Sequence, residues 1–456
     1  MLSVGKVQSK TCGVVARREL LKFGTLGVLG LSLGDLMRAQ AGAREPKGRA
    51  HSVILLWLWG GPSHLDTFDL KPLAATQYRG PYAPIATNVP GIEICEMLPR
   101  LARRADKYAI VRSLHHTSSD HGIAGTIGLT GSDAGATSLS GQVMRGQLKP
   151  THGSVMSRAV GLRPTLPAFV TLGGHLHQGH RPISGEGGGT LGRLYDPFRL
   201  DYDPREGIKI PQLELIDGLT SDGLTARRGL LAAFDRLSDK IERSAMIDKL
   251  DQFYQQAFSL LTSNESRRVF DLSREPEMLK RRYGRFRFGQ CCLLARRMIE
   301  AGSRFVQVNW SSHVEPVEDT GDGGWDMHDR NFQQFQDRHA WMLDQSVSAL
   351  LDDLGQRGLL EETVVVVVGE FGRTPKINGK AGRDHWNQCY SGLIAGGGIG
   401  AGQVVGSSDH RGEHPASRPV TPADLFTTVL HQIGISTAEM SSLGVAPQGE
   451  VIEELV

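Results

Sequence analysis

The sequence predicts an α/β fold in which a doubly wound, mostly parallel central sheet carries helices on both faces. Several short apolar runs end in glycine or polar residues, and segments with helical spacing lie between them. Strands that alternate with helices favour a parallel sheet, because parallel strands need long crossover connections. Ligands of such sheets bind at the carboxyl ends of the strands.

Five runs are predicted to be strands. The first, residues 52–59, is almost continuously apolar and ends in two glycines, as expected of a central strand buried on both faces. The others are residues 108–113, 168–172, 304–309 and 363–368, of which the last contains five consecutive valines.

Helices are predicted over residues 224–301 and 331–357, where apolar residues recur at helical spacing. A last helix is predicted from Pro422, with Thr421 as its cap. Residues 173–218 are rich in Gly, Pro and Asp and are predicted to form an irregular excursion. Residues 44–456 are therefore expected to form a single domain.

The first 43 residues are predicted to be a twin-arginine signal peptide. Arg17 and Arg18 precede a weakly hydrophobic stretch, and small residues follow near position 41. The stretch is shorter than the roughly 20 apolar residues that span a bilayer. An uncleaved anchor or an ordinary amphipathic helix remains an alternative. The expected partner is the twin-arginine export machinery, and the expected location is periplasmic or extracellular in a bacterium.

Composition excludes some classes of function. The 456 residues carry a formal net charge of +2, and no basic run marks a nucleic-acid surface. The five cysteines contain no C-x-x-C pair, which argues against a zinc knuckle or a redox motif.

Side chains that suit a metal ion follow the predicted strands. Carboxylate oxygens and neutral imidazole nitrogens are ligands for a divalent metal such as zinc, manganese, iron or calcium. The predicted metal ligands are His64, Asp66, Asp326, His328, Glu370 and His385. Any one His–Asp pair could instead be an ordinary hydrogen-bonded pair, but several clusters near strand ends favour a metal or anion site.

Other polar residues are predicted to contact an anionic substrate. Arg373 and Arg383 suit a bidentate grip on an anion, and His116 lies in the His-rich segment after the second strand. The spacing of His175, His177 and His180 leaves contact with substrate or metal open.

Taken together, the motifs resemble those of the exported bacterial family called domain of unknown function 1501, over nearly the whole chain. They are the Gly60–Asp69 segment, Trp325–His328, Gly369–Pro375 and Gly382–Trp386. The resemblance implies an alkaline phosphatase-like fold and a sulfatase-like or phosphatase-like site. It places His121 where that superfamily has its nucleophile, and Ser119 and Asp120 beside it as further catalytic candidates. No cysteine lies in this region, so a formylglycine mechanism is not expected.

Three functions follow as hypotheses. The leading one is a metal-dependent hydrolase of phosphate or sulfate esters, with a small anionic ester or a sulfated glycan as its ligand and His121 as metal ligand or base. The second is a non-catalytic protein that binds an anion or a glycan with a degenerate metal site. The third is redox or carbonyl chemistry at a single non-haem iron.

Overall fold

The computed structural model describes residues 48–161, 166–203, 207–209, 268–316 and 322–456, which belong to a unit spanning Pro46–Val456. The predicted signal peptide lies outside the described residues, as do residues 224–267 of the predicted helical region. Among the helices that are described, none has the length and apolar character needed to cross a membrane.

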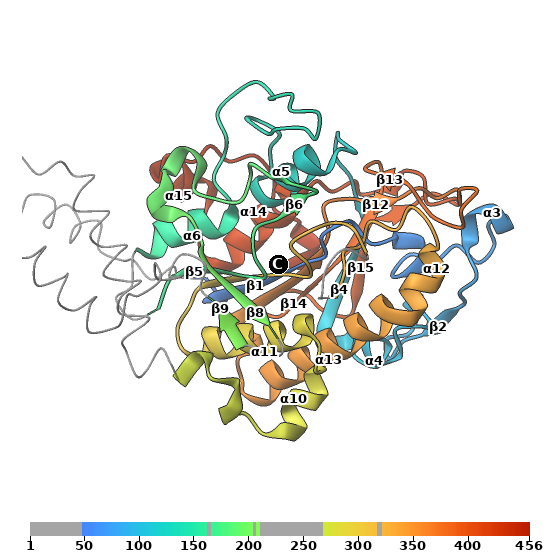
Figure 1. The fold of residues 1–456 in the computed structure, drawn as a ribbon, viewed down its shortest axis with the longest axis horizontal. Helices are drawn as coiled ribbons and strands as arrows, with labels where there is room; N and C mark the ends of the chain where they lie inside the picture. Colours follow the sequence, from blue (N-terminus) through green and yellow to red (C-terminus); the bar gives the residue numbers. More distant parts are fainter. Residues whose placement is uncertain (1–47, 162–165, 204–206, 210–267, 317–321) are drawn as a thin grey trace, which may run out of the picture. The chain divides into compact units, whose positions relative to one another are not determined.

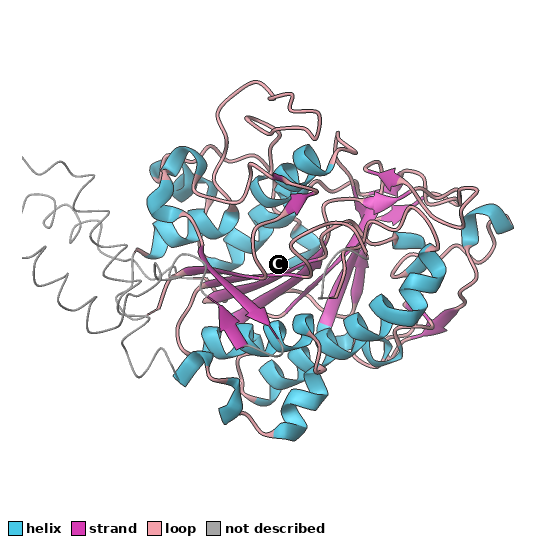
Figure 2. Ribbon diagram, viewed as in Figure 1, coloured by secondary structure: helices cyan, strands magenta, loops and turns pink. Residues whose placement is uncertain are grey.

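The core of the fold is a nine-stranded sheet with the strand order β15-β4-β14-β11-β1-β10-β5-β8-β9 (Figures 1 and 2). Its strands are β1 Ser52–Trp57, β4 Tyr108–Leu114, β5 Phe169–Leu172, β8 Phe198–Asp203, β9 Gly207–Lys209, β10 Phe305–Asn309, β11 Thr363–Val368, β14 Tyr390–Ala395 and β15 Gln403–Val405. β1 pairs in parallel with both β10 and β11. Two strands, β14 and β9, run antiparallel to their neighbours. The predicted doubly wound, mostly parallel sheet is confirmed.

The central strand β1 is buried on both faces, as its continuous apolar sequence predicts. Val53, Leu55 and Trp57 pack into one hydrophobic core, and Ile54 and Leu56 pack into another. Successive side chains of a strand point to opposite faces, so each core belongs to one layer of helices. The first layer contains α5 His121–Thr130, α6 His152–Val160 and α14 Pro422–Ile433, and the second contains α10 Glu277–Tyr283, α11 Arg287–Glu300 and α13 Ala340–Gln356 (Figure 1).

The five predicted strands are present, with ends that differ by at most two residues. β14 and β15 were not predicted, because their short sequences are interrupted or flanked by glycine. β8, which lies within the predicted excursion, is a regular strand of the main sheet. The helix predicted from Pro422 is confirmed as α14, with a capping box between Thr421 and Asp424, but it is not the last, because α15 Thr437–Ser442 follows it. The predicted helix over residues 331–357 is interrupted: α12 Asn331–Gln334 and α13 are joined by a π-helical turn, Phe335–His339.

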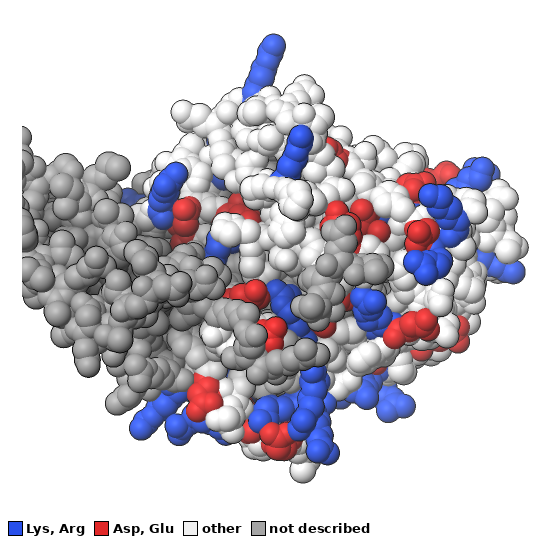
Figure 3. Space-filling view, viewed as in Figure 1, with Lys and Arg blue, Asp and Glu red and all other residues white. Residues whose placement is uncertain are grey.

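The topology brings the ends of several strands to one edge of the sheet. β1, β10 and β11 are mutually parallel, and β4 runs in the same direction because the antiparallel β14 separates it from β11. The segments that follow these four strands contain most of the predicted site residues. On the face shown in Figure 3, acidic and basic side chains are interspersed, which agrees with the near-zero net charge.

Candidate metal centre

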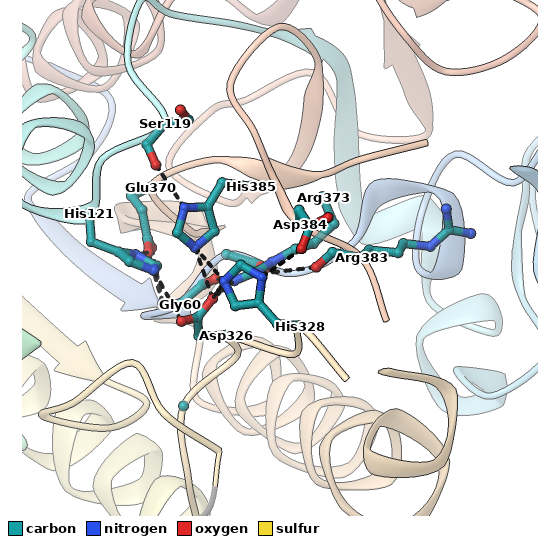
Figure 4. Close-up of polar contacts among 12 residues, drawn as sticks. Gly60, Ser119, His121, Asp326, His328, Glu370, Arg373, Arg383, Asp384 and His385 are labelled. Carbon is teal, nitrogen blue, oxygen red and sulfur yellow. Dashed lines mark hydrogen bonds and ion pairs between the residues drawn. The ribbon is translucent and has the colours of Figure 1, made fainter. Parts of the chain in front are cut away.

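Five polar side chains converge beyond the carboxyl edge of the sheet (Figure 4). They are His121, the first residue of α5; Asp326 and His328, in the segment between β10 and α12; Glu370, two residues beyond β11; and His385, in the short strand β13 His385–Trp386. The sequence predicted all five, and parallel strand ends bring them together from segments up to 264 residues apart.

Asp326 is the centre of the group. Its Oδ1 lies 3.0 Å from Nε2 of His385 and 2.9 Å from Nε2 of His328, and its Oδ2 lies 3.4 Å from Nε2 of His121. The ligand atoms of His121, Asp326 and His385 all lie within 4.8 Å of one another. Within the described residues, this is the single such group with three potential metal ligands.

The other nitrogen of each imidazole contacts an oxygen. Nδ1 of His121 lies 2.7 Å from Oε1 of Glu370, and Nδ1 of His385 lies 2.8 Å from the carbonyl oxygen of Ser119. Nδ1 of His328 lies 2.8 Å from Oδ1 of Asp384. These oxygens accept hydrogen bonds, so in the neutral imidazoles Nδ1 carries the proton and Nε2 carries a lone pair.

Three Nε2 atoms therefore face one carboxylate, an arrangement that suits a bound cation. His121 Nε2 is buried and has no hydrogen-bond partner, and Nε2 of His328 lies only 2.9 Å from Nε2 of His385. Metal-bound histidines typically donate their second N–H to a carboxylate or a carbonyl, as all three do here. The donor set therefore fits a divalent metal ion.

The electrostatics of the cluster follow from its burial and its charges. Burial opposes ionisation of Asp326, but Arg373 and the surrounding imidazoles outweigh it and hold the Asp326 pKa well below its usual range. Burial also acts to lower the pKa of His121, yet its contacts with Asp326 and Glu370 raise it overall. The contact with Asp326 raises the pKa of His328. Burial lowers the pKa of His385 to about 4.

The end of β1 supports the cluster through its backbone. The amide N–H of Gly60 donates to Oε1 of Glu370 at 2.9 Å and to Oε2 at 3.2 Å. Gly60 has a φ of 108°, and a Cβ atom there would come within 2.5 Å of the backbone of Trp325 and Asp326. Glycine is needed here on both grounds.

Arg373 pairs with Asp326 and is not exposed to solvent. Its Nη2 lies 2.8 Å from Oδ1 of Asp326, and its remaining donors bind the carbonyl oxygens of Gly60, Gly61 and Arg383. The side chain is fully buried. The guanidinium of Arg373 is therefore not exposed to bind a substrate anion, the role predicted for it.

Arg383, His64 and Asp66 lie outside the cluster. Arg383 is buried and binds Asp66 through Nε at 2.8 Å and Nη2 at 3.2 Å. Arg383 was predicted to bind an anionic substrate and Asp66 to bind metal, but in the structure the two side chains bind each other. His64 is buried in a 3₁₀ turn, His64–Asp66, and its Nε2 lies 2.8 Å from the carbonyl oxygen of Gly412. Neither side chain belongs to the group of potential metal ligands, which is His121, Asp326 and His385.

The remaining predicted residues have supporting positions. His116 is buried, with Nε2 2.6 Å from the carbonyl oxygen of Glu370, a contact that holds the backbone of Glu370. Asp120 caps α5 by accepting from the amide of Ile123 at 3.1 Å. Ser119 contributes its carbonyl oxygen to His385, as described above. His177 lies in β6 His177–Gln178, where its Nδ1 contacts the carbonyl of Gly179 at 2.8 Å, outside the cluster.

Sequence reasoning missed Asp384 as a site residue. Its carboxylate orients His328, and burial, which acts to raise the Asp384 pKa, is outweighed by the contact with His328, so that the pKa is lowered. The signal in the sequence was its position directly before His385. Adjacent residues of an extended segment point their side chains to opposite sides, so each can contact a different member of the cluster.

Solved structures show limited similarity to this chain. An i-CgsB crystal structure in complex with k-i-k-neocarrahexaose has 10% identity and a TM-score of 0.40, covering 89% of this chain and 75% of that chain. The PsFucS1 sulfatase from Pseudoalteromonas sp. has 13% identity and a TM-score of 0.34, covering 98% and 78%. The phosphonate monoester hydrolase SpPMH from Silicibacter pomeroyi has 12% identity and a TM-score of 0.32, covering 89% and 76%. These values are too low for functional residues to be transferred.

A family model gives the firmer result. No curated protein matches the chain. The model described as "Protein of unknown function (DUF1501)" matches residues 50–450, which include every residue of the metal centre. The resemblance seen in the sequence motifs is thus confirmed, and the chain belongs to the DUF1501 family.

Proposed function

We propose that the protein is an exported, divalent-metal-dependent hydrolase of phosphate or sulfate esters. The observation that carries the proposal is the convergence of three imidazole Nε2 atoms on Asp326, while every Nδ1 contacts an oxygen. Metal-bound histidines typically direct one ring nitrogen at the metal and the other at a carboxylate or carbonyl oxygen, and these three imidazoles have that arrangement.

In this proposal His121, Asp326 and His385 hold the metal, and His328 and Glu370 flank it. A bound divalent cation would polarise an ester oxygen and lower the pKa of a water molecule. Glu370 fixes the tautomer and orientation of His121, and Arg373 keeps Asp326 ionised. The ring of His328 is 44% exposed and has a raised pKa, so it is the imidazole best placed to exchange a proton at Nε2 with solvent or substrate.

The second candidate is a metal-binding protein that recognises an anion or a glycan without hydrolysing it. One observation favours it: both guanidinium groups predicted to grip an anion are buried and bound by the protein itself. The residue at the first position of α5 is His121, which lacks the hydroxyl or thiol of a usual covalent nucleophile.

Metal analysis and hydrolysis assays separate the two candidates. The donors include two imidazoles and one carboxylate, a set that iron(II) also accepts, so Zn, Mn, Ca and Fe are all measured in protein purified without chelator. We expect bound metal, and hydrolysis of 4-nitrophenyl phosphate or 4-nitrophenyl sulfate that is lost in Asp326→Ala and retained in Asp329→Ala. Asp329 is the matched control, because it is an exposed carboxylate three residues away.

Metal without hydrolysis of either ester would favour the binding protein. Protein that neither retains nor takes up any of the four metals would refute both candidates.

Export is part of the proposal and rests on the twin-arginine segment. We expect the chain in the periplasmic or extracellular fraction of a bacterium, and cytoplasmic retention when Arg17→Lys and Arg18→Lys are combined. Equal fractionation of the two proteins would contradict twin-arginine export.

A further inference from the structure

The π-helical turn Phe335–His339 breaks an otherwise helical segment next to the metal centre. Such turns insert one extra residue into an α-helix and are frequent at functional sites, because they redirect the side chains that follow. The last residue of the turn, His339, is fully buried, and the turn itself ends where α13 begins. The cluster described above does not include this imidazole.

His339 contacts the segment that carries Asp326. Its Nε2 lies 2.8 Å from the carbonyl oxygen of Gly324, two residues before Asp326. The ring stacks on Trp310, with centroids 5.4 Å apart and planes 14° apart, and meets Trp325 edge-on at 4.6 Å. The imidazole is thus fixed between two indole rings with one edge directed at Gly324.

A neutral imidazole donates from one of its two nitrogens, so the tautomer of His339 has to be assigned. Burial lowers its pKa to about 4, so the imidazole is neutral at physiological pH and has a single N–H. Nδ1 faces the carbonyl oxygen of Gln334, five residues earlier, at 3.3 Å. Because the contact from Nε2 to Gly324 is 0.5 Å shorter, Nε2 carries the proton and donates to Gly324.

The three amides of the segment Gly324–Asp326 each donate to a backbone carbonyl. Gly324 N–H donates to the carbonyl of Glu315 at 2.8 Å, Trp325 N–H donates to Trp59 at 2.9 Å, and Asp326 N–H donates to Val314 at 3.0 Å. These bonds leave the Gly324 carbonyl pointing toward the helix, where His339 supplies its donor. The backbone that presents Asp326 is therefore held between two loops and one imidazole.

We propose that His339 is a positioning residue of the metal centre: its Nε2–H, directed at Gly324 by the π-helical turn, holds the segment that presents Asp326. The inference rests on the proposed function in so far as Asp326 is a metal ligand. His339 itself does not contact the metal centre, so it acts through the placement of the Asp326 carboxylate.

Two substitutions of equal length isolate the hydrogen bond. His339→Gln retains an N–H donor and His339→Met does not, while both lose the aromatic ring. The probe is Zn²⁺ alone, titrated against a chromophoric chelator, with thermal unfolding of the metal-free protein measured in parallel. We expect His339→Met to bind Zn²⁺ about 10- to 100-fold more weakly than the wild type, the range seen when outer contacts of a metal site are removed. His339→Gln is expected to recover most of the loss.

His152 offers a matched control elsewhere in the fold. It is also a buried imidazole with a lowered pKa, about 3, and it stacks on Phe426 with centroids 4.0 Å apart. It lies in α6, away from the metal centre. His152→Met should therefore destabilise the protein and leave Zn²⁺ affinity unchanged.

The outcomes separate the inference from the proposed function. Three results would each overturn the role of His339. They are wild-type Zn²⁺ affinity in folded His339→Met, equal affinities of His339→Met and His339→Gln, and an equal loss of affinity in His152→Met. Should His339→Met fail to fold, His339→Phe, which keeps the ring and lacks the donor, takes its place with the same expectation. A wild-type protein that binds no Zn²⁺, Mn²⁺, Ca²⁺ or Fe²⁺ would overturn the proposed function itself, and the inference with it.

Discussion

Two clusters near the carboxyl edge of the sheet are built from the same kinds of residue and differ in how their charge is balanced. In the first, Asp66 is bound by Arg383 at 2.8 and 3.2 Å and by Nδ2 of Asn331 at 3.0 Å. Its carboxylate is thus compensated within the chain. His64, in the same turn, is neutral because burial lowers its pKa to about 4.

In the candidate metal centre, three imidazoles and one guanidinium surround the carboxylate of Asp326. Asp326 and Glu370 are two buried carboxylates, and among the residues that the structure describes one guanidinium, that of Arg373, pairs with this group, through Asp326. The pKa values of His121 and His328 are raised as a result, opposite in direction to that of His64. The same residue types thus form a compensated ion pair around Asp66 and, around Asp326, a group of imidazoles whose Nε2 atoms face one carboxylate.

The pH dependence of stability should be the largest effect, since it sums over several buried imidazoles. The pKa values of His64, His339 and His152 are lowered, so each contributes stability above its unfolded pKa of about 6.5, and this is lost as the pH falls toward the folded values, about 4, 4 and 3. Each pKa unit corresponds to about 1.4 kcal/mol. We expect the free energy of unfolding of the metal-free protein to fall by several kcal/mol between pH 7 and 4, as measured by urea denaturation.

The raised pKa values of His121 and His328 act in the other direction, because their contribution is present below about 6.5 and lost as the pH rises. Their opposing effect reduces the slope without reversing it. Stability that increases on acidification would show that the metal-centre imidazoles dominate, and the contrast between the clusters would then be misassigned.

Asp66→Asn should destabilise the protein without removing metal. The substitution leaves the buried Arg383 guanidinium without its counter-charge, a change that costs about 3–5 kcal/mol when one partner of a buried pair is lost. Chemical denaturation measures the loss, and a Zn²⁺ titration of the folded protein should give the wild-type affinity. Loss of Zn²⁺ binding with wild-type stability would place Asp66 in the metal centre after all.

His385→Ala should have the converse effect. Removing a direct ligand should weaken Zn²⁺ binding by more than about 100-fold, the upper range for changes in outer contacts. His414→Ala is the control, because His414 is exposed and lies outside the cluster. Chelator competition measures both, and equal affinities in the two variants would contradict the assignment of His385.

Asp384→Asn should give the smallest effect. Its carboxylate is 54% exposed and orients His328 through one contact of 2.8 Å, so we expect a loss of Zn²⁺ affinity of about 10-fold and an unchanged unfolding curve. Asp329→Asn changes an equally exposed neighbour and should alter neither quantity. A loss as large as that of His385→Ala would make His328 a full ligand.

The central strands could be predicted from the sequence, because a strand that is buried on both faces has a continuous apolar run, as β1 and β11 do. The sequence also predicted that His121, Asp326 and His385 lie close together, because parallel strands place their carboxyl ends at one edge of the sheet. It could not show that the turn after β1 directs Asp66 toward Arg383, because that depends on the packing of residues more than 300 positions apart. Nor could it show the π-helical turn, because the apolar spacing of residues 331–357 continues across it.

Gly60 affects which strand end can provide a carboxylate to this site. The strand end that occupies the middle of the sheet offers no side chain at this point, and a Cβ atom would collide with the backbone of the Asp326 segment. The carboxylate at this point comes from the neighbouring strand: Glu370, two residues beyond β11, accepts a hydrogen bond from the Gly60 amide. The end of β1 therefore contributes space and a backbone N–H donor, and the end of β11 contributes the negative charge. A substitution at Gly60 would affect Glu370, and a substitution at Glu370 would leave the Gly60 amide without its acceptor.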